Sequence, residues 1–173
     1  AIEPNGLQYL VRFHLEGTTP VWTYSLKETE GTEDALLEKR IWMQPGANTS
    51  TIRYDLTQAK YPCRLHIKAM VNNRDHHGST RADDRQMHIT PVENGLGITA
   101  FEGTEPFYLL SDKARVTLQH IWYKNYFLSM EAYRGLEAVE NNLYAGEFHA
   151  ELHFGESLTL VASTEANPNL NGI

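Results

Sequence analysis

Residues 63–71, CRLHIKAMV, alternate apolar and polar side chains almost without a break. The odd positions carry the apolar set, Cys63, Leu65, Ile67, Ala69 and Val71. The even positions begin with the polar set, Arg64, His66 and Lys68. Successive side chains of a strand point to opposite faces of a sheet, so this pattern predicts a half-buried strand of an antiparallel sheet.

The same period of two recurs along the chain. In LQYLVRFHLE (7–16) it predicts a buried face made of Leu7, Tyr9, Val11, Phe13 and Leu15. In EFHAELHF (147–154) it predicts a face made of Phe148, Ala150, Leu152 and Phe154. Shorter strands are expected over 20–26, 36–43, 49–56, 85–92, 96–101, 114–123 and 157–164. About ten closely spaced strands with little helical pattern predict an all-β fold, an antiparallel β-sandwich.

Two connections stand out from the strands. FGES (154–157) predicts a tight hairpin, with Gly155 supplying a positive φ at the first central position. The stretch 125–142, NYFLSMEAYRGLEAVENN, mixes periods and predicts a long irregular connection with at most a short helix. In such a helix Glu131 and Arg134 would lie three apart on one face, within reach of an ion pair. Long connections in compact domains are often functional.

Composition narrows the classes of function. The chain has 173 residues, which predicts a single sandwich domain over 1–165 and the start of a linker over 166–173. Its net charge is −7 and its lysines and arginines are scattered, so we expect no nucleic-acid partner. No apolar run approaches the ~20 residues that span a bilayer, and no export signal opens the chain, so we expect no membrane partner. The chain begins without Met, so we expect it to be part of a longer protein.

The chain has eight histidines, which are potential metal ligands. His149, Glu151 and His153 share one face of a predicted strand, about 7 Å apart at strand rise. Imidazole and carboxylate are suitable zinc or iron ligands, but three groups must converge on one point. We interpret these three as the polar face of an amphipathic strand, and we expect no metal and no cofactor.

Candidate catalytic and binding groups lie elsewhere. Glycoside hydrolysis needs two carboxyls ~5 to 9.5 Å apart. The acids that could be nominated are Asp75, Glu131, Glu137 and Glu140, although a chain with 22 acidic residues forms such pairs by chance. In VNNRDHHGST (71–80), Arg74, Asp75 and His77 either contact a ligand or partner or hold the loop in shape, and the second interpretation is favoured. Trp22, Trp42 and Trp122 either stack on sugars or pack internally, and packing is favoured.

Several ordered motifs carry a family resemblance, from about Pro20 to Ser163. The first contains Glu38, Lys39, Arg40, Trp42, Met43, Pro45, Gly46, Asn48, Thr49 and Tyr54. The second contains Arg74, Asp75, His77 and Gly78, and the third Glu131, Arg134, Gly135 and Leu136. They are followed by Glu140, Gly146, Phe148, Leu152, Gly155 and Glu156. Together they resemble the N-terminal, non-catalytic domain of bacterial and archaeal glycogen debranching enzymes (amylo-α-1,6-glucosidases). The family often has proline where Ala145 stands, and its glycine-rich opening motif and its helical barrel are absent here.

The resemblance implies a galactose-mutarotase-like supersandwich, here a truncated domain of a longer enzyme. It places the catalytic acids in the absent helical barrel, so no catalytic residue is carried over. It implies a cytoplasmic glycoside hydrolase of glycogen catabolism that cleaves α-1,6 branch bonds. The expected partners are the catalytic helical domain of the same polypeptide and glycogen or another α-glucan. Arg74, Asp75, His77, Glu131 and Arg134 are the expected contacts with the glycan cleft or the neighbouring domain. The alternatives are a stand-alone carbohydrate-binding module and, less favoured, a sugar epimerase or histidine metal enzyme.

Overall fold

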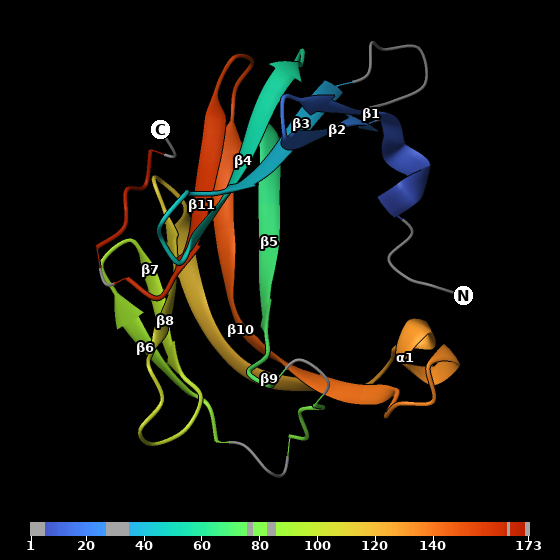
Figure 1. The fold of residues 1–173 in the computed structure, drawn as a ribbon. Helices are drawn as coiled ribbons and strands as arrows, with labels where there is room; N and C mark the ends of the chain where they lie inside the picture. Colours follow the sequence, from blue (N-terminus) through green and yellow to red (C-terminus); the bar gives the residue numbers. More distant parts are fainter. Residues whose placement is uncertain (1–5, 27–34, 76–77, 83–85, 166, 172–173) are drawn as a thin grey trace.

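The computed structural model describes residues 6–26, 35–75, 78–82, 86–165 and 167–171 (Figure 1). These residues form strands and two short helical segments. The strands of the first half are β1 (Leu10–Glu16), β2 (Thr19–Leu26), β3 (Ala35–Met43), β4 (Thr49–Gln58) and β5 (Cys63–Val71). Those of the second half are β6 (His88–Val92), β7 (Gly95–Thr99), β8 (Phe107–Ser111), β9 (Arg115–Phe127), β10 (Val139–Leu152) and β11 (Ser157–Ser163). The helical segments are η1 (Gly6–Tyr9) and α1 (Ser129–Tyr133).

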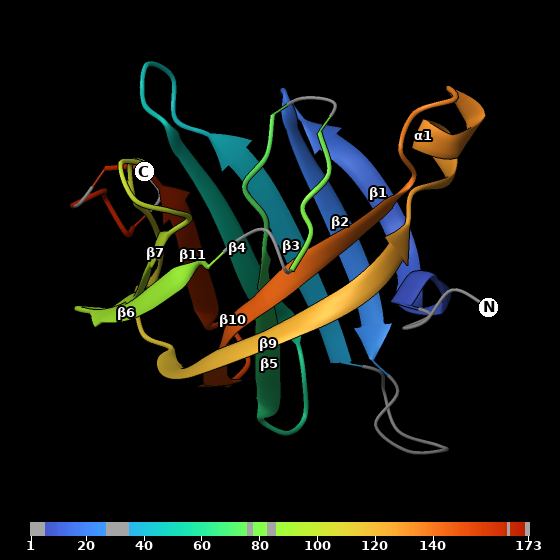
Figure 2. The same ribbon diagram turned by 90° about the horizontal axis from the view of Figure 1, so that it is seen from below.

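The strands form two antiparallel sheets that lie against each other. The larger sheet has the order β1-β2-β3-β4-β11-β8-β7-β6, and the smaller sheet has the order β5-β10-β9. The strand β11, which comes last in the chain, lies inside the larger sheet and pairs with β4 on one side and β8 on the other. Long β9 and β10 cross the larger sheet obliquely (Figure 2). The prediction of an all-β antiparallel sandwich is confirmed.

The core lies between the sheets and follows the predicted period of two. Along β5 the residues alternate between more buried and exposed from Cys63 to Val71, as CRLHIKAMV predicts. On β10 the side chains of Phe148 and Leu152 are buried. One core cluster contains Val71, Met87, Leu96, Ile98, Leu143, Ala145, Phe148 and Leu160. The other contains Ala35, Leu37, Leu56, Leu152 and Leu158. Phe154, predicted to be buried with Phe148, is instead exposed because it lies in the turn after β10.

The apolar face predicted for 7–16 is not buried. Leu7, Tyr9, Val11, Phe13 and Leu15 are all exposed, by 43–76% of their surface. The strand β1 is an edge of the larger sheet, and the two sheets diverge toward the side where β1 and α1 lie (Figure 1). A period of two shows that one face is apolar, but it does not show whether a second layer covers that face.

The connections differ from the predictions in instructive ways. FGES is a tight turn, but β10 and β11 belong to different sheets, so it joins the two layers and makes no hairpin. Gly155 has a positive φ of 83° and occupies the second central position, because the amide of Glu156 donates to the carbonyl of His153. The stretch 125–142 contains the short helix α1, and the flanking strands β9 and β10 take up most of the rest. The strand β8 was not predicted.

Candidate functional site

The loop after β5 contains the first group of predicted site residues. Arg74 Nε donates to Oε2 of Glu140 at 2.8 Å, and Nη1 donates to the carbonyl of Asp75 at 3.2 Å. The side chain of Glu140 is only 10% exposed, at the start of β10. A charged hydrogen bond to an almost buried carboxylate is a strong contact. Arg74 therefore fastens its loop to the smaller sheet.

Asp75 shapes the same loop locally. Its Oδ1 accepts a hydrogen bond from the amide of Gly78, three residues later. An aspartate that bonds a following amide stabilises a turn. The structural interpretation of Asp75 is thereby supported, and its carbonyl accepts a hydrogen bond from Arg74. His77, the third member of the predicted group, lies outside the described residues.

Further contacts fasten the loop along the first residues of β10. Asn72 Nδ2 donates to the carbonyl of Asn141 at 3.3 Å, and the amide of Asn141 donates to the carbonyl of buried Thr80 at 2.8 Å. Arg81 forms an ion pair with Glu137, just before β10. The hydrogen bond from Arg81 lowers the pKa of the Glu137 carboxyl. The loop is thus held at both of its described ends.

Glu131 and Arg134 form the second group of predicted site residues, on α1. Arg134 Nη1 lies 3.4 Å from Glu131 Oε1, so the predicted i,i+3 ion pair is present. Gly135, with φ of 73°, ends the helix, and its amide donates to the carbonyl of Ala132. The two predicted groups flank the start of β10 and lie at the same end of the molecule (Figure 1).

Large apolar side chains surround this end and are exposed. At the end of β9 and around α1 they are Tyr123, Tyr126, Phe127, Met130, Tyr133 and Leu136. Tyr133 is 85% exposed and Phe127 is 68% exposed. The strand β1, which carries the exposed Val11, Phe13 and Leu15, lies on the same open side (Figure 1). We call these residues together the open-end surface.

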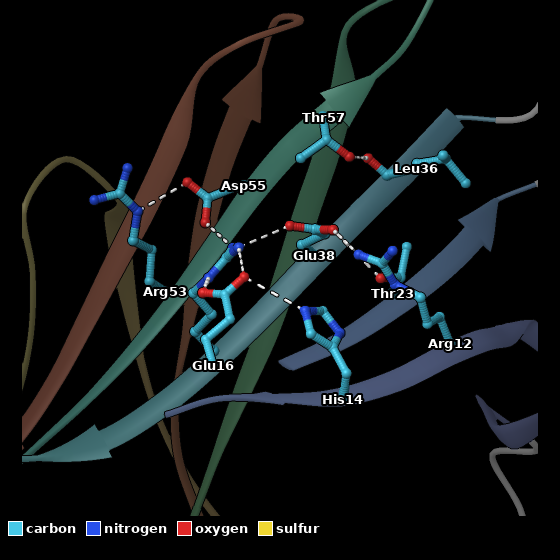
Figure 3. A network of polar contacts seen from close by, with 10 residues as sticks. Arg12, His14, Glu16, Thr23, Leu36, Glu38, Arg53, Asp55 and Thr57 are labelled. Atoms are coloured by element: carbon cyan, nitrogen blue, oxygen red, sulfur yellow. Dashed lines mark hydrogen bonds and ion pairs between the residues drawn. The ribbon is translucent and has the colours of Figure 1, made fainter. Parts of the chain in front are cut away.

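A charged network covers the face of β1–β4 that points away from the smaller sheet (Figure 3). Arg40 is at its centre, with Nη1 2.9 Å from Asp55 Oδ2 and Nη2 2.9 Å from Glu38 Oε2. The same guanidinium reaches Glu16 Oε1 at 3.2 Å, and Arg53 Nε donates to Asp55 Oδ1 at 2.8 Å. The hydrogen bond from Arg40 lowers the pKa of the Glu16 carboxyl. One guanidinium thus contacts three carboxylates from three strands.

Beside the network is a hollow of about 600 Å³, lined by the network and by Trp42 and Phe154. Of the predicted site residues that the structure describes, none lines this hollow. Glu38, Arg40, Trp42, Gly155 and Glu156 carry the family resemblance and also line this hollow. Pairing of β3 with β4, and of β4 with the turn before β11, brings them together. Those pairings are long-range, so no local pattern could have revealed the hollow.

The three tryptophans lie in different surroundings. Trp122 packs partly buried against the core, as favoured from the sequence. Trp22 lies on the inner face at the open side, 5.5 Å from the ring of Phe13. Lys39 Nζ lies 5.8 Å from the Trp22 ring, and burial lowers the pKa of this lysine. Trp42 lines the hollow.

The predicted histidine row does not converge on one point. Glu151 pairs with Arg64 at 3.5 Å, and His153 pairs with Glu156 at 3.7 Å in the turn. Among the described residues, three ligand atoms gather instead at His66, Glu147 and His149. His149 and Glu151 lie on β10, but His153 begins the turn after it, so the three do not form one strand face. His149 instead has His66 on the adjacent strand β5 and Glu147 on β10 itself as neighbours.

Comparison with known proteins gives a family match. The family described as the N-terminal domain of glycogen debranching enzyme matches residues 1–159 of the chain. No curated protein and no solved structure matches the chain. Among the described residues, no helix has both the length and the apolar character needed to cross a membrane.

Proposed function

We propose that this chain, which belongs to the family of glycogen debranching enzyme N-terminal domains, is a non-catalytic β-sandwich that supports the catalytic helical domain of a longer polypeptide. In that polypeptide, acids of the helical domain hydrolyse the α-1,6 glucosyl bonds at branch points of glycogen or a similar α-glucan. Glycogen breakdown of this kind takes place in the cytoplasm, which we propose as the location. The chain's own partner is then the catalytic domain.

The observation that carries this proposal is the open-end surface. Exposed apolar patches of several large side chains mark interaction sites in soluble proteins. Tyr133, Phe127 and Met130 project around α1, while Phe13 and Val11 leave the inner face of β1 uncovered. A neighbouring domain placed against this side would bury both groups. Interfaces between domains of one chain bury surfaces of this kind.

The predicted site residues fit the edge of such an interface. Arg74 and Asp75 keep their loop in shape through Glu140 and Gly78. Arg134 remains more than half exposed although it pairs with Glu131. We propose that Arg74, Asp75, His77, Glu131 and Arg134 hold or form the contact with the catalytic domain or the rim of the glycan cleft.

The ion pairs of this region support a non-catalytic role. Glu131, Glu137 and Glu140 each face an arginine, namely Arg134, Arg81 and Arg74. The pKa of Glu137 is lowered by its arginine. A glycosidase needs one carboxyl with a raised pKa as its general acid. An ion-paired carboxylate is poorly suited to that task.

The test uses the full-length enzyme that contains this chain. The double substitution Phe127→Ser and Tyr133→Ser should lower its melting temperature and its debranching rate. The same substitutions should leave the melting temperature of the 173-residue chain unchanged, because both side chains are exposed there. Tyr61→Ser, at a 56% exposed side chain between β4 and β5, is the matched control and should change neither protein. An unchanged full-length enzyme would refute the supporting role.

A second candidate is binding of a neutral glycan at the hollow. Trp42 and Phe154 offer flat apolar rings beside Arg40 and Arg53. Aromatic rings stack on apolar faces while planar polar groups bond hydroxyls, which is the chemistry a sugar requires. Affinity electrophoresis in gels containing glycogen tests it. Retardation of the chain that Phe154→Ala abolishes would favour a carbohydrate-binding module, whereas equal mobility with and without glycogen would exclude it.

A further inference from the structure

Three potential metal ligands meet on the outward face of the smaller sheet. His66 on β5 and His149 on β10 are direct partners in the strand register. Glu147 lies two residues before His149, so its side chain leaves β10 on the same face. The ligand atoms of these three side chains all lie within 4.8 Å of one another. This cluster is separate from the residues on which the proposed function rests.

The separations suit a small divalent ion. Nδ1 of His66 lies 3.4 Å from Oε1 of Glu147, and Nε2 of His149 lies 3.8 Å from Oε2 of Glu147. Zinc binds nitrogen and oxygen at about 2.0–2.2 Å in tetrahedral geometry, which puts neighbouring ligand atoms roughly 3.4 Å apart. The two imidazole rings meet edge to face with centroids 4.8 Å apart. Small side-chain rotations would therefore bring all three atoms to bonding distance.

A neighbouring tyrosine orients the carboxylate of the cluster. The hydroxyl of Tyr144 donates to Oε2 of Glu147 at 2.9 Å, and the Tyr144 side chain is buried. Lys68, the register partner of Glu147, extends its Nζ over the rings of Tyr123 and Tyr144, at 5.9 and 5.3 Å from their centroids. Ligands of metal sites are commonly held by such outer hydrogen bonds. Glu147 is thus oriented by a group that is itself fixed.

We propose that His66, Glu147 and His149 bind one divalent transition-metal ion of the zinc class. Two imidazole nitrogens and one carboxylate oxygen are a ligand set that zinc accepts, with a fourth position left for water or another ligand. That position faces solvent, because His66 is 58% exposed at its side chain. The bound ion would tie β5 to β10 across the smaller sheet. The site goes beyond the proposed function and does not depend on it.

Isothermal titration of the 173-residue chain, prepared without a histidine tag, tests the site with zinc chloride. We expect one equivalent of Zn²⁺ to bind. His66→Ala and His149→Ala each remove a ligand and should weaken binding by more than about 100-fold, and Tyr144→Phe should weaken it by about 10- to 100-fold. Zinc should also raise the melting temperature of the unmodified chain and leave that of His66→Ala unchanged, because only a bound ion stabilises the fold.

His153→Ala is the matched control. It removes another exposed histidine beside a carboxylate, Glu156 at 3.7 Å, but that pair is not part of the three-ligand cluster. This variant should bind zinc as the unmodified chain does. His66→Gln, checked by circular dichroism, separates loss of a ligand from loss of the fold. No saturable binding to the unmodified chain, or binding by His66→Ala and His66→Gln as tight as that by the unmodified chain, would overturn the proposal.

Discussion

Arg74 and Glu140 are 66 positions apart in the sequence and are joined by a hydrogen bond of 2.8 Å from Nε to Oε2. Their contact fixes the loop after β5 to the first residues of β10. It joins Arg74, predicted to lie in a polar loop, to Glu140, an acid that could be nominated for glycoside hydrolysis. The pair is therefore a structural ion pair at the end of the molecule where α1 and the open-end surface lie.

Arg74→Ala should destabilise the chain by about 2 kcal/mol, because it leaves the nearly buried Glu140 carboxylate without its charged donor. Urea unfolding at neutral pH measures the loss. Arg64→Ala is the control, since Arg64 is 78% exposed and pairs with Glu151, which is 52% exposed. The control should cost less than about 1 kcal/mol. An equal loss of unfolding free energy in the two variants would mean that the Arg74–Glu140 pair stabilises the chain no more than a surface ion pair does.

Arg40→Ala should also destabilise the chain by about 2 kcal/mol at neutral pH, because the half-buried Glu38 and Asp55 lose their shared donor. The difference from the unmodified chain should shrink in acid as Glu16, whose pKa is lowered by its hydrogen bond from Arg40, becomes protonated. Arg12→Ala is the comparison, because Arg12 reaches Glu38 at 3.3 Å from a largely exposed position. A loss of stability in Arg12→Ala as large as that in Arg40→Ala would show that Arg40 contributes no more to the network than Arg12 does.

Acid should destabilise the chain through carboxyls whose pKa is lowered in the folded state. The pKa values of Glu16, Glu137 and Glu156 all lie below their ordinary value of 4.5, chiefly because of hydrogen bonds from Arg40, Arg81 and the amide of His153. The unfolded chain then takes up these protons first as the pH falls. Stability is fully present above about pH 4.5 and should decline below it. Urea midpoints measured between pH 7 and pH 3 test this, and a constant midpoint would contradict it.

Alkali should act on Tyr144. Burial of its ring, followed by its hydrogen bond to Glu147, raises its pKa from 10.0 to about 12. Between these values the unfolded chain loses this proton and the folded chain keeps it, so stability should fall as the pH rises from 10 to 12. Tyr144→Phe should lose less stability over this range, whereas Tyr133→Phe, at an 85% exposed ring, should behave as the unmodified chain. The free energy of unfolding of each protein is measured at pH 9 and at pH 11. An identical loss of stability between these pH values in all three proteins would refute the prediction.

Gly155→Ala should cost about 1–2 kcal/mol, because φ is 83° there and an L side chain in that region is strained. An added Cβ would meet no atom within 4 Å, so the cost is one of backbone conformation alone. Gly155→Asn should cost less, since asparagine tolerates this region better. Gly6→Ala, at an equally open position without a positive φ, should have almost no effect. Thermal unfolding distinguishes the four proteins, and a neutral Gly155→Ala would contradict the argument.

Sequence patterns predicted those features that are decided within one strand. CRLHIKAMV has one apolar face and one polar face, and β5 places them accordingly. The ion pair of Glu131 with Arg134 is likewise local, because three positions on a helix fix it. What the patterns missed depends on contacts between distant segments. The cover over Phe13 depends on how far the smaller sheet extends, and the meeting of His66 with His149 depends on the register of β5 with β10.

Two of the misses have simple physical causes. FYLLS (107–111) has no alternation, because β8 lies within the larger sheet and every residue of it is at least partly buried. The turn at Gly155 looked like a hairpin because two strong strands flank it. Its amide nevertheless bonds to the carbonyl of Leu56, so the chain there passes from one layer to the other. Neighbours in the sequence need not be neighbours in a sheet.

The position of β11 has a consequence for how the molecule is made. A ribosome delivers β1–β4 and β6–β8 first, and these two groups of strands share no pairing with each other. Among the described residues, only 157–163, which follow both groups in the sequence, bridge them, through β4 on one side and β8 on the other. The two groups of the larger sheet are therefore joined only after both have been synthesised, and a nascent chain that stops before Ser157 would expose the unpaired edges of β4 and β8, where another chain could pair.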